Sequence, residues 1–140
     1  MTEAVVVTGI GVVSPLNPEG DRERFWTSLC AGETAVREVR SFDASSYPCR
    51  VAAEVNRELL GEHGDAKEPA LRMAEIAFGL ALEDAGIAGE ECNPRRTGVV
   101  VGTVLGGTIS GERYLQAMEN ATGEAVEGLE HYPLRSIAAF

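Results

Sequence analysis

The chain has 140 residues, of which 44% are hydrophobic and 24% are charged, and its formal net charge is −10. This length and balance are typical of one soluble globular domain with a packed core, so they exclude an intrinsically disordered chain. The excess of acidic residues repels phosphate groups, which excludes nucleic acid and anionic membrane surfaces as expected partners.

The N-terminal part of the chain predicts a strand and then a helix. Residues 4–8, with the sequence AVVVT, form an apolar β-branched run that is too short for a helix and is followed by the stretch GIG. Such a run predicts a strand buried on both faces. An amphipathic helix follows, with Asn17 as its N-cap, Pro18 as its first residue and Gly32 at its end, and we expect it on the outside of a sheet.

The middle of the chain has weaker patterns. The stretch FDASSYP contains turn-forming residues, and RVAAEV at residues 50–55 predicts a short strand or the edge of a sheet. Residues 56–67 are polar and interrupted by glycine, which predicts a surface loop with one helical turn.

The strongest helix prediction covers residues 68–85, which are rich in Ala, Leu and Met and are followed by Gly86, a suitable C-terminal cap. The polar positions of this helix lie on one narrow strip together with Gly79, and apolar side chains cover the rest of its circumference. A helix of this kind is buried on more than one side, so we expect it in a layer between sheets.

The last predicted elements are a second buried strand at residues 97–103, a glycine loop and a helix at residues 110–121. Strand, helix, strand and helix therefore alternate along the chain. This order predicts the α/β class with a largely parallel sheet.

The glycine loop in RTGVVVGTVLGGTISG has the outline of a phosphate-binding loop. Gly102 and Gly107 have the G-x-x-x-x-G spacing between a predicted strand and a predicted helix. The motif then requires Lys followed by Ser or Thr, whereas Thr108 and Ile109 occupy those positions. Without the lysine the loop lacks a counter-charge for nucleotide phosphates, so the glycines are expected to serve positive φ angles and close packing.

The cysteines and histidines form no recognisable site. Cys30 lies at the end of its predicted helix, where the helix dipole disfavours a thiolate, Cys49 follows a proline, and Cys92 lies among acidic residues. His63 and His131 lie far from each other and from any cysteine, so no metal site is predicted. Without a C-x-x-C pair, a signal peptide or a run of roughly 18 to 20 apolar residues, the expected location is the cytoplasm.

Five segments nevertheless form an ordered set along the chain: VVVTGIGVVSPL, FWTSLCAGETAV, FDASSYPCRVAAEV, ALEDAGI and RRTGVVVGTVLGG. Together they resemble the N-terminal part of the β-ketoacyl-acyl carrier protein synthases, which are condensing enzymes of the thiolase superfamily. The resemblance implies a layered αβαβα fold built from two similar halves, of which this chain is an incomplete part of the first. It also implies a buried helix between two sheets, in agreement with residues 68–85.

The resemblance implies acyl transfer without a metal or other cofactor. In the family a cysteine at a helix N-terminus accepts an acyl group from carrier-protein phosphopantetheine, two histidines promote decarboxylation of malonyl-carrier protein, and backbone amides form an oxyanion hole. The cysteine lies in a segment resembling ACAS or ACTS beyond the point that matches Phe140, and the histidines follow later. Residues 1–140 are therefore expected to be a β-ketoacyl synthase N-terminal segment, truncated before the nucleophile and inactive alone, with no catalytic residue assigned.

The resemblance places the glycine loop beside the acyl pocket, with Leu105 as an aliphatic lining residue followed by Gly106 and Gly107. An alternative is a tight turn with Leu105 in the hydrophobic core. Val104 departs from the family, which often has glycine there, and the last ten residues, HYPLRSIAAF, match only loosely.

The implied partners are an acyl carrier protein and a ketosynthase-type subunit in a homodimer or heterodimer. Two alternatives stay open: a non-catalytic partner subunit similar to chain-length factors, and a stand-alone binding module or remnant. Because half of the layered fold would be missing, we expect the isolated chain to aggregate, to oligomerise or to need a partner.

Overall fold

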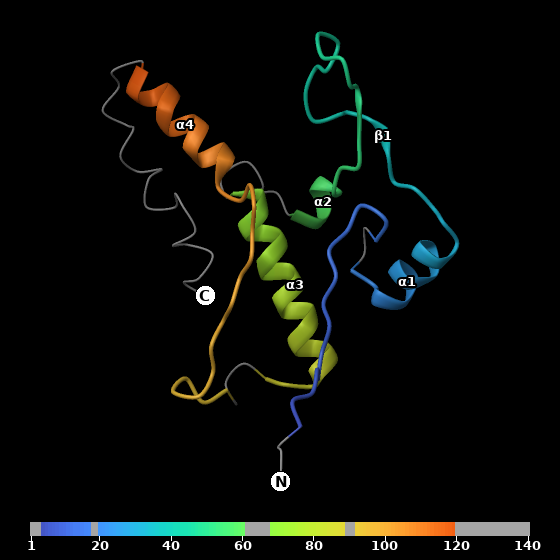
Figure 1. Cartoon of the computed structure of the whole chain (residues 1–140), viewed down its shortest axis with the longest axis vertical. Coiled ribbons are helices and arrows are strands. Elements are labelled where there is room, and N and C mark those ends of the chain that lie inside the picture. The colour runs from blue at the N-terminus through green and yellow to red at the C-terminus, as the bar shows by residue number, and fades with distance from the viewer. Residues whose placement is uncertain (1–3, 18–19, 61–67, 89–91, 120–140) are drawn as a thin grey trace.

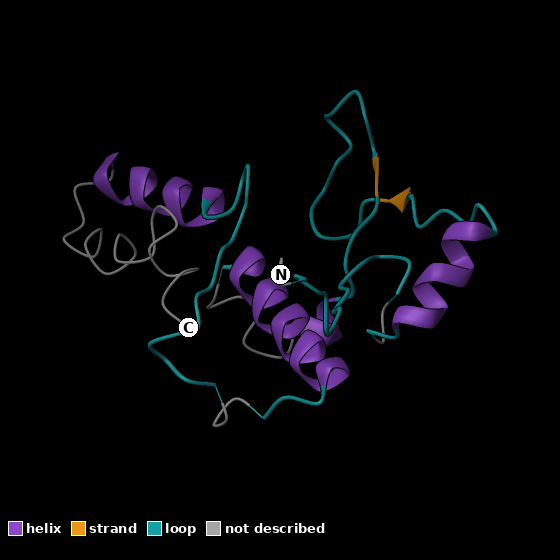
Figure 2. Ribbon diagram, turned by 60° about the horizontal axis from the view of Figure 1, so that its bottom comes forward, coloured by secondary structure: helices purple, strands orange, loops and turns teal. Residues whose placement is uncertain are grey.

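The computed structural model describes residues 4–17, 20–60, 68–88 and 92–119 (Figure 1). Its regular elements in chain order are α1 (Arg22–Cys30), β1 (Arg37–Glu38), β2 (Val51–Ala52), α2 (Arg57–Leu60), α3 (Pro69–Ala85) and α4 (Thr108–Glu119). Figure 2 shows that long loops join the helices. The strands β1 and β2 form a two-stranded sheet. Within these ranges no helix is long and apolar enough to cross a membrane.

Helix α1 starts later than the sequence predicts. Its N-cap is Asp21, whose Oδ1 accepts hydrogen bonds from the backbone N–H groups of Glu23 at 2.8 Å and Arg24 at 3.1 Å. The predicted cap, Asn17, is wrong, because its backbone N–H closes a turn by donating to the Ser14 carbonyl at 2.9 Å. Pro18 lies outside the described residues. The predicted end is confirmed, because Gly32 follows the helix with a φ of +69°.

A short antiparallel pair replaces the expected parallel sheet. Strand β1 pairs with β2 so that Arg37 lies opposite Ala52 and Glu38 lies opposite Val51. This pair confirms the short strand predicted within residues 50–55. We call residues 37–52 the arm, which stands apart from α3 in Figure 1. Within the described ranges this pair is the whole of the sheet structure, so a largely parallel sheet is not seen there and stays a prediction.

The two predicted buried strands, residues 4–8 and 97–103, are not strands in this structure. Val5 is fully exposed and Val100 is 98% exposed. A strand needs a neighbouring strand to pair its backbone N–H and C=O groups, and the described residues supply none for either segment. The β-branched runs therefore lie as irregular segments on either side of α3 (Figure 1).

Helix α3 confirms the strongest prediction in its bounds. The Gly86 cap has a φ of +66°, and its backbone N–H donates to the Glu83 carbonyl at 3.0 Å. The predicted burial on more than one side is wrong for the described chain. None of the helix residues is fully buried, and Phe78 is 43% exposed. The described residues contain no layer that covers the side of α3 on which Phe78 lies.

The N-terminal segment covers one side of α3 through direct backbone contact. A Cβ atom added to Gly11 would lie 1.9 Å from the carbonyl oxygen of Ala77, and one added to Gly9 would lie 2.1 Å from that of Ala81. Real Cβ atoms do not approach so closely, so only glycine fits at these two positions. The glycines after the predicted strand thus serve close packing, as expected from the sequence.

Side-chain hydrogen bonds join α3 to its neighbours at both ends. Asp84 Oδ2, near the C-terminal end, accepts hydrogen bonds from Ile10 N at 2.9 Å and from the guanidinium of Arg22. Near the N-terminal end, Arg72 Nε donates to the Leu60 carbonyl at 3.2 Å and so ties α2 to α3. Helix α2 is the single turn predicted for the polar segment after residue 55.

Candidate functional site

The glycine loop before α4 is closed by its own hydrogen bonds. We call residues 102–107 the 102–107 loop. The Gly106 N–H donates to Thr103 Oγ1 at 2.9 Å, and the Leu105 carbonyl accepts from Thr108 N at 3.2 Å and Thr108 Oγ1 at 2.6 Å. Hydroxyl groups of threonine thus hold the loop at both of its ends.

Gly107 makes the turn from the loop into the helix. It is buried and has a φ of +87°, a region that residues with a side chain rarely adopt. Its carbonyl accepts the first helical hydrogen bond of α4, from the Gly111 N–H at 2.9 Å. Helix α4 therefore begins at Thr108, two residues before its predicted start.

The loop presents aliphatic side chains outward. Leu105 is 75% exposed and the neighbouring Val104 is 96% exposed. The alternative in which Leu105 packs into a hydrophobic core is therefore not what this structure contains. An exposed leucine on a hydrogen-bonded loop can contact another apolar group, and the role of Leu105, Gly106 and Gly107 beside an acyl group stays a prediction.

A carboxylate from α3 reaches the first turn of α4. Glu68 Oε2 accepts hydrogen bonds from Ser110 N at 3.1 Å and from Ser110 Oγ at 2.8 Å, across 42 positions in the sequence. The first backbone N–H groups of a helix have no acceptor in their own helix, so this carboxylate supplies one. The start of α3 is thereby joined to the start of α4, directly after the 102–107 loop.

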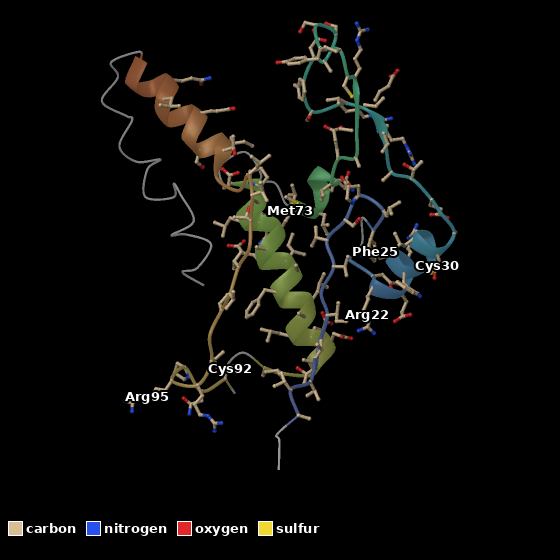
Figure 3. All side chains as sticks on the ribbon, in the orientation of Figure 1. Arg22, Phe25, Cys30, Met73, Cys92 and Arg95 are labelled. Carbon is tan, nitrogen blue, oxygen red and sulfur yellow. The ribbon has the colours of Figure 1, made fainter. Side chains whose placement is uncertain are left out.

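A cavity of about 740 Å³ lies beside this contact. Its apolar wall includes Leu60, Pro69, Met73 and Ile109. Its polar wall includes residues 37–41 of the arm and Glu54. Figure 3 shows Met73 near the N-terminal end of α3. The three predicted loop residues do not line this cavity, which receives only Ile109 from the first turn of α4.

The cysteines are separate free thiols. Cys30 and Cys49 are exposed and Cys92 is half-buried, and Figure 3 shows Cys30 and Cys92 in different parts of the molecule. In the ranges that the structure describes, no group of three or more His, Cys, Asp or Glu residues could hold a metal ion. Both histidines, His63 and His131, lie outside those ranges.

Sequence reasoning found the loop but missed the carboxylates that connect α3 to its neighbours. Glu68 precedes Pro69 at the start of the strongest predicted helix, which is a local signal for a cap. Its bonding to Ser110, and that of Asp84 to Ile10 and Arg22, have no local signal because the partners lie 42 to 74 positions away.

Comparisons with known proteins identify the family. The chain matches the beta-ketoacyl synthase N-terminal domain over residues 2–139. The tetracenomycin polyketide synthase ketoacyl synthase alpha subunit of Streptomyces glaucescens is 36% identical over 114 residues, which are 78% of this chain and 26% of that protein. The 3-oxoacyl-(acyl-carrier-protein) synthase 2 of Coxiella burnetii is 38% identical over 109 residues, which are 74% of this chain and 26% of that protein.

A beta subunit is also similar. The tetracenomycin polyketide synthase ketoacyl synthase beta subunit of Streptomyces glaucescens is 31% identical over 133 residues, which are 91% of this chain and 32% of that protein. The chain therefore spans about a quarter to a third of the length of these relatives.

The chain belongs to the β-ketoacyl synthase family and matches its N-terminal domain. This membership confirms the resemblance that the five ordered segments carry, and it implies a thiolase-like fold.

Proposed function

We propose that the chain is the N-terminal segment of a β-ketoacyl-acyl carrier protein synthase, which joins an acyl thioester to malonyl-carrier protein with loss of carbon dioxide. The observation that carries this proposal is the family match over residues 2–139. Cys30, Cys49 and Cys92 match no catalytic motif of the family, so the chain is not competent for the reaction alone. Its part in the reaction is to provide structure around the acyl group.

The proposed architecture is the layered thiolase-like fold. Residues 4–8 and 97–103 are strands in that fold, and further chain covers the exposed side of α3 around Phe78. The β-branched composition of both segments supports this arrangement, as do the backbone contacts of Gly9 and Gly11 with α3.

The 102–107 loop is proposed to lie beside the acyl pocket, with Leu105 contacting the acyl chain. The exposure of Leu105 and Val104 supports this, because aliphatic side chains on a tightly hydrogen-bonded loop suit contact with a hydrocarbon chain. Gly106 and Gly107 allow the turn that presents Leu105.

The proposed partners are an acyl carrier protein, which delivers the acyl group, and a ketosynthase-type subunit in a dimer. The similarity to both an alpha and a beta subunit supports a subunit partner. A second candidate function, a non-catalytic subunit of the chain-length-factor type, is favoured by the 31% identity to the beta subunit over 91% of the chain. We place the protein in the cytoplasm, which the free state of its cysteines supports.

Acylation measured by mass spectrometry tests the proposal. The chain is incubated with acyl-carrier protein, and its intact mass should stay unchanged because it carries no nucleophile for acyl transfer. A stable acyl-thioester on Cys30, Cys49 or Cys92 would contradict the assignment. Sequencing of the coding region downstream of Phe140 separates the two candidates: a cysteine in an ACxS context indicates a condensing subunit, and glutamine there indicates the chain-length-factor type.

A further inference from the structure

The carboxylate of Glu68 serves a helix other than its own. Glu68 occupies the N-cap position of α3 but makes no capping hydrogen bond to that helix. Its Oε2 atom instead receives both donors of Ser110, the backbone N–H and the hydroxyl, and these contacts are half-buried. Because both bonds end on one oxygen, they fix the position of Ser110 closely relative to the start of α3.

Ser110 is the third residue of α4, so holding it fixes the first helical turn. The backbone N–H at this position has no acceptor inside the helix, and a negative charge at a helix N-terminus is favourable. The Gly111 N–H already bonds to the Gly107 carbonyl. The first turn of α4 is therefore held by one hydrogen bond to Gly107, which directly precedes the helix, and by two to Glu68, which lies at the start of α3.

We propose that Glu68 is a positioning residue for the 102–107 loop, whose placement sets which acyl chains Leu105 can accommodate. The first turn and the loop move together, because Thr108 is bonded twice to the Leu105 carbonyl and Gly107 is buried. A displacement of Ser110 therefore also displaces Leu105. In its acyl-chain part this inference rests on the proposed function.

The same contact joins two parts of the apolar wall of the 740 Å³ cavity. Pro69 follows Glu68, Ile109 precedes Ser110, and both line that cavity. Loss of the Glu68 carboxylate therefore removes the contact that holds both Ile109 in the cavity wall and the 102–107 loop. The effect of Glu68 on acyl selection is exerted through Ser110, without contact between Glu68 and the acyl group.

Amide hydrogen exchange tests the positioning role. In Glu68→Ala the Ser110 amide should exchange about tenfold faster than in the wild type, because the hydrogen bond from its N–H is lost. Glu83→Ala removes an exposed glutamate at the other end of α3 and should leave this exchange rate unchanged. Equal exchange of the Ser110 amide in wild type and Glu68→Ala would overturn the proposal.

Two further variants separate positioning from general destabilisation. Glu68→Gln keeps an amide oxygen that can accept from both Ser110 donors, so it should restore most of the protection. Ser110→Ala removes only the hydroxyl, so it should accelerate exchange less than Glu68→Ala does. Failure of Gln to restore protection, or an equal effect of the two alanine variants, counts against a hydrogen bond from the Ser110 N–H to Glu68.

Acyl-chain preference in the complete synthase that carries this chain tests the second part. In Glu68→Ala the ratio of kcat/KM between long and short acyl substrates should shift by about threefold or more, because one methylene gained or lost in a hydrophobic pocket changes kcat/KM by about tenfold or more and a displaced loop loses part of such a contact. Glu68→Gln should restore the wild-type ratio.

The two readouts fail separately. Faster exchange with an unchanged acyl preference overturns the selective role of Glu68. Absence of condensing activity in the complete wild-type protein overturns the proposed function, and the acyl-chain part of the inference with it. The exchange of the Ser110 amide still decides whether Glu68 holds α4.

Discussion

Glu68 and Asp84 are acidic residues at opposite ends of α3, and each binds groups that are remote in the sequence. Glu68 accepts two hydrogen bonds from Ser110, and Asp84 accepts from Ile10 and Arg22. Hydrogen bonds to charged acceptors are stronger than those between neutral groups. One carboxylate thus holds the N-terminal segment against the C-terminal end of α3, and another holds α4 against its N-terminal end.

Asn17 differs from these two carboxylates, because its polar side chain is buried without a hydrogen bond in the described part of the chain. Its side chain is fully buried, and among the residues that the structure describes neither its Oδ1 nor its Nδ2 has a hydrogen-bond partner. An unsatisfied buried amide costs free energy of folding. The sequence predicts this asparagine as a helix N-cap, because Asn followed by Pro is common at the start of a helix. The actual cap, Asp21, begins the helix one turn later.

The carboxyl group of Asp43 in the arm has a pKa below its usual 3.8, because the Ser45 backbone N–H and then the Ser45 hydroxyl donate to it. A pKa that is lower in the folded than in the unfolded chain adds stability above the unfolded value. That contribution is lost as the pH falls through the folded value, here below about 4. NMR titration should give a pKa below 3.8 for the wild type.

Ser45→Ala provides the comparison for this titration. The backbone hydrogen bond at 2.9 Å remains in this variant, so the pKa of Asp43 should rise only part of the way. A wild-type pKa at or above 3.8 would disagree with the contact between Asp43 and Ser45.

Among the elements, the helices were the most predictable from sequence and the strands the least. The end of α3 is set by Gly86 and its start lies at Pro69, both of which are local signals. Residues 4–8 and 97–103 have equally strong local β-branched patterns, but a strand also requires a partner at its side. That requirement is not local, so sequence patterns indicated strand propensity without showing where pairing takes place.

The candidate site divides in the same way. The 102–107 loop was visible because glycines interrupt a β-branched run before a helix. The Glu68–Ser110 contact could not be predicted, because it depends on how α3 and α4 lie relative to each other. The role of Leu105 beside an acyl group stays a prediction, and its exposure became known only from the structure.

Gly11→Ala should detach the N-terminal segment from α3. The added Cβ would meet the Ala77 carbonyl oxygen at 1.9 Å, so the segment must move and the bond from Ile10 N to Asp84 should break. We expect the Ile10 amide to exchange at least about tenfold faster in this variant.

Gly79→Ala is the matched control for this change. An added Cβ at Gly79 meets nothing within 4 Å, and it lies in the interior of α3. Alanine there should stabilise the helix by about 0.5–1 kcal/mol and leave the Ile10 amide protected. If both variants behaved alike at Ile10, the close backbone contact at Gly11 would be disproved.

In the molecule as a whole, apolar side chains are exposed on both sides of α3 and on the arm. They belong mainly to the N-terminal segment, to residues 99–105 and to the arm. Ala44 is the one buried hydrophobic residue in the described part of the chain. Soluble monomers rarely expose so many apolar side chains together with so small a buried core, so we expect further chain or a partner to cover them.

The isolated chain should therefore associate. We expect light scattering after size exclusion to give a mass above 14.9 kDa, and we expect strong binding of the dye ANS to the exposed apolar surface. Co-expression with a ketosynthase-type subunit should lower the dye signal, since that subunit would cover the same surface. A monomer with a cooperative thermal transition and no dye binding would contradict this expectation.

The contact between Ile10 and Asp84 also has a consequence for synthesis on the ribosome. The two residues lie 74 positions apart. At translation rates of about 5–20 residues per second, about 4–15 s pass between their appearances. During this interval the valine run at residues 5–7 has been made, while the helix on which its segment packs has not. The earliest part of the chain must therefore remain unaggregated until α3 has formed.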